Sequence, residues 1–290
     1  MPGLRPLLTL AALAVLTAGS GAAAETPGRL AVVQGGDESR LVVMRPDGSG
    51  ARTLVRREFG LQSPAWTPDG HALAFVSSRG GGPGIYVVND DGTGLRRLVV
   101  TNREARDPAF SPEGRRIAYV GDRGLFVARA DGSDRRRLTR APLEDSEPTW
   151  SPDGMRIAFV RDTQDMRVSV CVVAVGTGRI RQLTRTTEWA ASPAWAPNGK
   201  SIAFVRMPVS SDVGRLAIMR PDGRGLRNLA PHLRDVVDLS WSPDSRELVF
   251  IRKIRPDSEV FRIRLSDSTV RKVTRNSISD YGPAWGPARR

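Results

Sequence analysis

Three carboxylates recur at one position of an internal repeat, each of them three residues before an aromatic residue. The residues at this position are, in chain order, Ser63, Asp107, Glu147, Ser192, Asp238 and Gly282. Carboxylates that converge on a concave surface raise the local concentration of cationic groups. If the repeats are arranged in a ring, these residues surround one opening, and we predict that they form a binding site.

The segments that lead into this position carry further acidic residues, namely Glu104, Glu144, Asp145, Glu188, Asp235 and Asp280. Trp189 is the only tryptophan outside the repeated aromatic position, and it lies in one of these segments. We therefore add Trp189 to the candidate binding residues. One interpretation is that the acidic residues are ordinary solvated loop residues, which turns favour. The other is a face that binds a basic or amine-bearing partner, with a cation in the channel as a variant.

No other group of residues points to chemistry. The two histidines, His71 and His232, have no metal-ligating residues nearby, and the repeated Asp-Gly pairs are typical of turns. The sequence contains no nucleophile elbow, zinc-protease motif, calcium loop or phosphate-binding glycine loop. We expect no catalytic residues, no metal and no cofactor, although an enzyme that uses only carboxylates leaves few marks in a sequence.

The elements that position these residues are short β-hairpins. Residues 148–160, P-T-W-S-P-D-G-M-R-I-A-F-V, predict a strand, a tight turn and a second strand. In the turn, proline presets φ, Asp153 can bond its own backbone, and Gly154 can adopt a positive φ. Related phrases occupy residues 63–76, 107–120, 192–205 and 238–251, with a truncated copy at 282–287.

The period of the repeat identifies the architecture. Successive turn prolines are 44, 40, 45, 46 and 44 residues apart, counted along Pro68, Pro112, Pro152, Pro197, Pro243 and Pro287. Each full repeat also contains a second hairpin, for example at 125–139, so it supplies four strands. A period in the forties with no helical segment is typical of propeller blades. We predict an all-β fold, a six-bladed β-propeller with four-stranded antiparallel blades.

The two ends of the repeat region complete each other. The first repeat supplies three strands, within residues 29–33 and 41–55, and the C-terminal segment 283–285 supplies the missing one. We therefore predict that the C-terminal strand joins the N-terminal blade and closes the ring, which leaves no open sheet edge between first and last blades. The repeated aromatic residues are expected in the core, and these are Trp66, Phe110, Trp150, Trp195, Trp241 and Trp285.

Residues 1–24 have the features of a secretory signal peptide. Arg5 gives a positive start, residues 7–16 are almost entirely apolar, and residues 22–24 offer a small-residue cleavage site. A retained anchor is the alternative. We expect residues 25–290 to form the propeller, in an extracytoplasmic location that is periplasmic, at the cell envelope or secreted. Cys171, the single cysteine, excludes an internal disulfide and is expected to be buried.

The formal net charge of +13 comes almost entirely from arginine, since only Lys200, Lys253 and Lys272 are lysines. Many of the arginines flank the predicted fourth strands, where charge discourages edge-to-edge aggregation. The alternative is a polyanion site, with weak contact to an anionic envelope surface. Nucleic acid is not an expected partner, because export removes the protein from it and no aromatic stacking platform accompanies the arginines.

The phrase S-P-D-G-x-x-I-A-F-V, followed by x-D-G-x-x-x-R-x-L-T, resembles the repeat of TolB-like propellers over residues 29–287. The resemblance implies an exported or periplasmic six-bladed scaffold that binds a protein or peptide through its channel face. Relatives of prolyl oligopeptidase and oligogalacturonate lyases share this repeat. We expect this sequence, unlike TolB itself, to have no α/β domain before the blades and to form a stand-alone propeller. We also expect a monomer. The alternative function is a carbohydrate-active or lyase-type enzyme that uses Asp107, Glu147 and Asp238.

Overall fold

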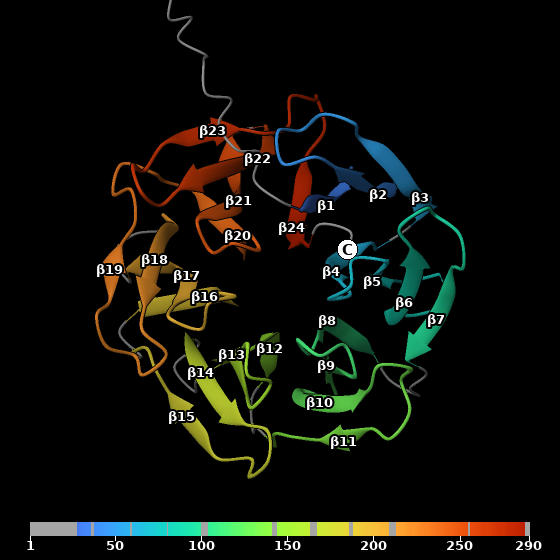
Figure 1. The fold of residues 1–290 in the computed structure, drawn as a ribbon, viewed down its shortest axis with the longest axis horizontal. Helices are drawn as coiled ribbons and strands as arrows, with labels where there is room; N and C mark the ends of the chain where they lie inside the picture. The colour runs from blue at the N-terminus through green and yellow to red at the C-terminus, as the bar shows by residue number, and fades with distance from the viewer. Residues whose placement is uncertain are drawn as a thin grey trace, which may run out of the picture.

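The computed structural model of the protein is a ring of six blades (Figure 1). Each blade is a four-stranded antiparallel sheet, which confirms the predicted fold class. The described part of the chain forms no helix that could cross a membrane. The predicted signal peptide, residues 1–24, lies outside the described residues, which are 28–35, 38–58, 60–79, 81–99, 104–140, 144–162, 167–185, 188–208, 213–254 and 256–287.

Blade 1 is built from both ends of the described chain. Its strands, from the centre of the ring outward, are β24 (Asp280–Gly286), β1 (Arg29–Gln34), β2 (Ser39–Met44) and β3 (Arg52–Glu58). β24 runs antiparallel to β1, with Trp285 opposite Leu30 and Ala284 opposite Ala31. Figure 1 shows the red C-terminal strand beside the blue N-terminal one. This pairing confirms the predicted closure of the ring.

The other five blades follow in chain order, each starting with its innermost strand (Figure 1). Blade 2 contains β4 (Gln62–Trp66), β5 (Ala72–Ser77), β6 (Gly84–Asn89) and β7 (Arg96–Val99). Blade 3 contains β8 (Ala105–Phe110), β9 (Arg116–Gly121), β10 (Gly124–Arg129) and β11 (Arg136–Arg137). Blade 4 contains β12 (Asp145–Trp150), β13 (Arg156–Asp162), β14 (Val168–Ala174) and β15 (Ile180–Gln182). Blade 5 contains β16 (Glu188–Trp195), β17 (Ile202–Pro208), β18 (Arg215–Met219) and β19 (Arg227–Asn228). Blade 6 contains β20 (Val236–Trp241), β21 (Glu247–Ile254), β22 (Asp257–Arg264) and β23 (Val270–Lys272).

The repeated turn connects the two innermost strands of a blade. Between β12 and β13, Asp153 Oδ1 accepts the Met155 N–H at 2.9 Å, and Gly154 has a φ of 66°. These are the roles predicted for the two residues. Because the two strands are antiparallel, the turns and the beginnings of the innermost strands lie at opposite ends of the blades. We call the first end the turn face and the second the channel face.

The apolar core consists of clusters between neighbouring blades. In one of them, Trp150 and Phe159 of blade 4 pack with Leu125 and Val127 of blade 3. Cys171 belongs to the same cluster, and burial raises the pKa of its thiol to about 11. The repeated tryptophans are buried as predicted. Phe110 is only partly buried and is the exception among the repeated aromatic residues.

Arginines of the outer strands join neighbouring blades. Arg136 donates to a main-chain oxygen of the next blade at 3.0 Å, Arg181 does so at 2.9 Å, and Arg52 makes the same kind of bond. The acceptors are the carbonyls of Val175, Asp222 and Asp90, respectively. These arginines therefore hold the ring together, in addition to any effect of their charge on aggregation.

Candidate binding site at the channel mouth

The six repeated positions lie at a β-bulge near the start of each innermost strand. In β12, for example, the register with β13 shifts between Ser146 and Thr149. The residue at this position has a φ between 46° and 53° in all six blades, and the residues are Ser63, Asp107, Glu147, Ser192, Asp238 and Gly282. A positive φ costs of order 1–3 kcal/mol at a residue other than glycine, and such strain concentrates at functional sites. The repeated positive φ therefore indicates that the bulge has a functional role as well as a role in the fold.

Side chains at the bulge bond to the next blade. Asp107 Oδ1 accepts the Ser63 hydroxyl at 2.8 Å, and Asp107 Oδ2 accepts the Glu147 N–H at 3.3 Å. Glu147 Oε2 in turn accepts the Ser192 N–H at 2.6 Å. Among the described residues, Glu147 Oε1 has no hydrogen-bond partner. One carboxylate oxygen is thus available to a ligand.

Asp238 completes the polar ring on the other side. Its Oδ1 accepts the Ser192 hydroxyl and its Oδ2 accepts the Gly282 N–H, both at 3.4 Å. The structure thus brings all six residues together, as the repeat geometry predicts. We call them the bulge ring.

The bulge ring surrounds a cavity of about 740 Å³ on the channel face, which we call the channel mouth. Its volume lies within the range of about 300–1,000 Å³ that is usual for ligand pockets. The residue after each bulge position adds an apolar lining, from Pro64, Pro108, Pro148, Pro193, Leu239 and Pro283. The channel mouth therefore combines a polar ring with apolar surface that a ligand can contact.

Burial changes the ionisation of Glu147 and Asp238 in the bulge ring. It raises the pKa of Glu147 to about 7, against the Ser192 N–H, which lowers it, while the charges of Asp238 and Asp107 add to the rise. Burial raises the pKa of Asp238 as well. Glu147 therefore exchanges its proton near neutral pH, and a cation bound beside it would favour the carboxylate.

Three of the six acidic residues in the segments around the channel mouth are paired with arginine, and a fourth, Asp280, is bonded to a neutral amide. Asp145 accepts two hydrogen bonds from Arg161, at 2.7 and 2.9 Å. Asp280 is fully buried and accepts the Gln34 amide at 2.8 Å. Ion pairs also join Glu144 to Arg106 and Glu188 to Arg206.

Trp189 lies in a strand, β16, and not in a loop as its sequence context indicates. It is opposite Met207 and is 40% exposed, but it does not belong to the lining of the channel mouth. Tyr281 does line the mouth and is 44% exposed, and sequence reasoning missed it. The available signal was its place directly before Gly282, in the truncated sixth repeat.

The described residues contain no group of three or more histidine, cysteine, aspartate or glutamate side chains that could hold a metal ion. What the channel mouth can do is accept hydrogen bonds and attract positive charge.

Six four-stranded blades, closed by a C-terminal strand and enclosing a polar ring at one end, define the class of six-bladed β-propellers. The protein-family model described as the TolB beta propeller domain matches residues 28–289 of the sequence. The chain belongs to the TolB β-propeller family.

Solved structures show the same fold at low sequence identity. TolB from Acinetobacter baumannii is 21% identical, with 91% of this chain and 67% of that chain covered and a TM-score of 0.80. A putative TolB from Agrobacterium tumefaciens is 16% identical, with 90% and 99% covered and a TM-score of 0.69. An oligogalacturonate lyase in complex with manganese is 15% identical, with 86% and 74% covered and a TM-score of 0.57. No match is found among curated proteins.

Proposed function

We propose that this protein is an exported scaffold that binds a basic segment of a protein or peptide partner at its channel mouth. The observation that supports this most strongly is the bulge ring, in which three carboxylates surround a cavity of about 740 Å³. Membership of the TolB β-propeller family supports a role in protein interaction. The binding residues are Ser63, Asp107, Glu147, Ser192 and Asp238, with Tyr281 at the rim and Trp189 farther out on the channel face.

The carboxylates suit a primary amine as the bound group. Glu147 Oε1 is not engaged by the described residues, and Glu147 loses its proton near neutral pH. An ammonium group placed there can donate to Glu147 and is attracted by Asp107 and Asp238. The prolines of the lining and Tyr281 offer apolar contacts to the aliphatic part of a lysine side chain.

The enzyme alternative receives less support. The described residues that line the channel mouth include no histidine, and the carboxylates are tied to main-chain N–H groups of neighbouring blades. Such bonds position the carboxylates as fixed acceptors. We also propose an extracytoplasmic location, on the signal features of residues 1–24 and on the family, and a monomer in solution.

The test is binding of a fluorescent lysine-rich peptide and of the same peptide with acetylated amines. We expect the wild type to prefer the free amines. The triple variant Asp107→Asn, Glu147→Gln and Asp238→Asn should weaken that binding at least tenfold. Capture of partners from an envelope extract, with the same two proteins, extends the test to natural ligands.

A matched control makes the same charge change on the turn face, with Asp91→Asn, Asp131→Asn and Asp222→Asn. Each of these aspartates accepts an N–H two residues later, and asparagine keeps that acceptor. The control should bind the peptide like the wild type. Equal peptide affinity of the wild type and the channel-mouth variant would overturn the proposal.

A further inference from the structure

A repeated contact fills the space between blades at the turn face. At three of the six interfaces, the arginine that begins the second strand of one blade lies over the repeated tryptophan of the next. The distance from the guanidinium carbon to the ring centroid is 4.6, 4.7 and 4.9 Å for Arg29 over Trp66, Arg116 over Trp150 and Arg156 over Trp195. A cation over an indole is a favourable arrangement.

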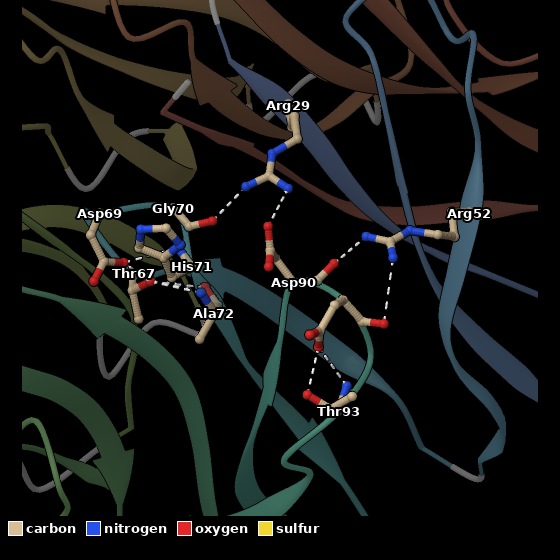
Figure 2. Close-up of polar contacts among 10 residues, drawn as sticks. Arg29, Arg52, Thr67, Asp69, Gly70, His71, Ala72, Asp90 and Thr93 are labelled. Atoms are coloured by element: carbon tan, nitrogen blue, oxygen red, sulfur yellow. Dashed lines mark hydrogen bonds and ion pairs between the residues drawn. The ribbon is translucent and has the colours of Figure 1, made fainter. Parts of the chain in front are cut away.

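Figure 2 shows the polar contacts that Arg29 of blade 1 makes with Asp90 and Gly70 of blade 2. Arg29 forms an ion pair with Asp90 at 2.6 Å and also donates to the Gly70 carbonyl. Arg116 similarly donates to the Gly154 carbonyl at 3.0 Å. The guanidinium and the indole thus occupy the interface together, and the turn glycine of the next blade accepts from the arginine.

The interface between blades 2 and 3 lacks both groups. The strand registers pair Trp66 with Leu73 and Phe110 with Ile117, so Ala72 occupies the position that Arg116 has in the next blade. The aromatic residue it faces is Phe110, where the other blades have tryptophan. A methyl group and a phenyl ring thus take the places that a guanidinium and an indole have between blades 1 and 2, 3 and 4, and 4 and 5.

A cavity of about 490 Å³ lies at this interface. Its apolar walls come from Ala72, Val87, Leu98 and Phe110, and both blades contribute. Polar and charged side chains also line it, from Asp69, Asn89, Arg96 and Glu113. Phe110 is only partly buried, whereas Trp66 is 8% exposed and Trp150 is 6% exposed, so the phenyl ring borders open space.

We propose that this cavity binds an indole ring, either as a free small molecule or as the tryptophan side chain of a partner. The cavity has the apolar walls and the volume of a ligand pocket. The fold itself places an indole at the corresponding position of the other interfaces. Arg96 has no ion-pair partner among the described residues and can lie over a bound ring as Arg29 lies over Trp66.

This site is separate from the channel mouth, because the cavity is lined by the turns of blades 2 and 3 on the opposite face. If the cavity does not bind indole, the proposed peptide binding at the channel mouth is unaffected. Likewise, failure of peptide binding leaves the indole proposal unaffected. Asp69 and Glu113 can accept the ring N–H. Hydrogen bonds from the His71 N–H and the Thr67 hydroxyl hold the pKa of Asp69 low, and the pKa of Glu113 is also lowered.

The test is titration of indole into the whole protein, followed by saturation-transfer NMR. The variant Ala72→Arg supplies the missing guanidinium, and Phe110→Trp supplies the missing indole. Each fills the cavity with a group that the fold accommodates at other interfaces, so both variants should fold. We expect each of them to weaken indole binding at least tenfold.

The control is Ser201→Arg, which places arginine at the corresponding position before β17 and leaves the cavity open. It should bind indole within twofold of the wild type. N-acetyltryptophanamide distinguishes the sources, since binding of both probes indicates a partner side chain and binding of indole alone indicates a small molecule. No indole binding by the wild type, or equal binding by Ala72→Arg, would overturn the proposal.

Discussion

At the scale of single residues, the bulge ring combines strain with an unusual ionisation state. Asp107, Glu147 and Asp238 have left-handed backbone conformations, and each carboxylate accepts an N–H from the following blade. The bonds recover part of the cost of the conformation. Repetition of the sequence predicted that these residues meet. It could not predict the positive φ or the proton exchange of Glu147, because both depend on the neighbouring blades.

The first prediction concerns Glu147. Its pKa is 4.5 in the ordinary state and about 7 in the folded protein, so the folded state holds the proton more tightly. The resulting stabilisation is complete below about pH 4.5 and is lost as the pH rises through 7. Glu147→Gln should therefore become more stable than the wild type at pH 8, by about 1–3 kcal/mol. Urea unfolding at pH 5 and pH 8 measures this difference.

Glu113→Gln is the control for this prediction. Arg116 pairs with the exposed Glu113 carboxylate at 2.8 Å, and the pKa of Glu113 is lowered, so its stabilising contribution is present above its ordinary pKa. This variant should lose a little stability at pH 8, up to about 1 kcal/mol. An unchanged pH dependence in Glu147→Gln would contradict the assignment.

At the scale of strands, the same position in two blades has a charged partner on the neighbouring strand in one blade and a neutral partner in the other. Asp145 of β12 lies opposite Arg161, whereas Asp280 of β24 lies opposite Gln34. The first pair is a two-bond ion pair, and the second is an amide bonded to a buried carboxyl group. Burial raises the pKa of Asp280, and its Oδ2 is among the described buried polar atoms that lack a hydrogen bond.

The same substitution should therefore have different effects in the two blades. Asp145→Asn leaves Arg161 without its counter-charge and should cost about 3 kcal/mol of unfolding free energy. Asp280→Asn removes a buried charge but keeps the oxygen that Gln34 uses, so it should be neutral or stabilising at pH 8. Urea unfolding of both variants decides the matter, and equal losses would contradict the proposed difference between the pairs.

The hairpins were predictable because turn chemistry is local, and the phrase Pro-Asp-Gly specifies it within four residues. The partners that side chains find on neighbouring strands and blades could not be predicted from the sequence. The arginine-rich outer strands indicated repulsive edges, but Arg136 and Arg181 bond to carbonyls of the next blade. The cavity beside Phe110 could not be predicted without the strand register, because only the register shows that Ala72 is equivalent to arginines of other blades.

At the scale of the whole molecule, β24 completes both blade 1 and the ring. Trp285 belongs to the apolar cluster that joins blades 6 and 1, together with Leu30 and Val249. Removal of residues 280–290 should expose that cluster and the edge of β1, and we expect loss of cooperative unfolding and a tendency to aggregate. Near-ultraviolet circular dichroism and size-exclusion chromatography measure these effects.

A shorter truncation, which removes only residues 288–290, is the control and should unfold like the full chain. It leaves β24 and its pairing with β1 intact. If the variant that lacks residues 280–290 still unfolds cooperatively, five complete blades suffice for a stable fold. That result would contradict the expectation that ring closure by β24 is required.

The pairing of β24 with β1 also sets an order of events during synthesis. The ribosome delivers residue 29 long before residue 286, so β1 waits without its inner neighbour while the other blades emerge. An unpaired strand edge is a template for association with another chain, and contacts so distant in sequence form slowly. Blade 1 can be finished only after residues 280–286 have been synthesised. A factor that shields the β1 edge during that interval would raise the yield of folded protein without changing its final stability.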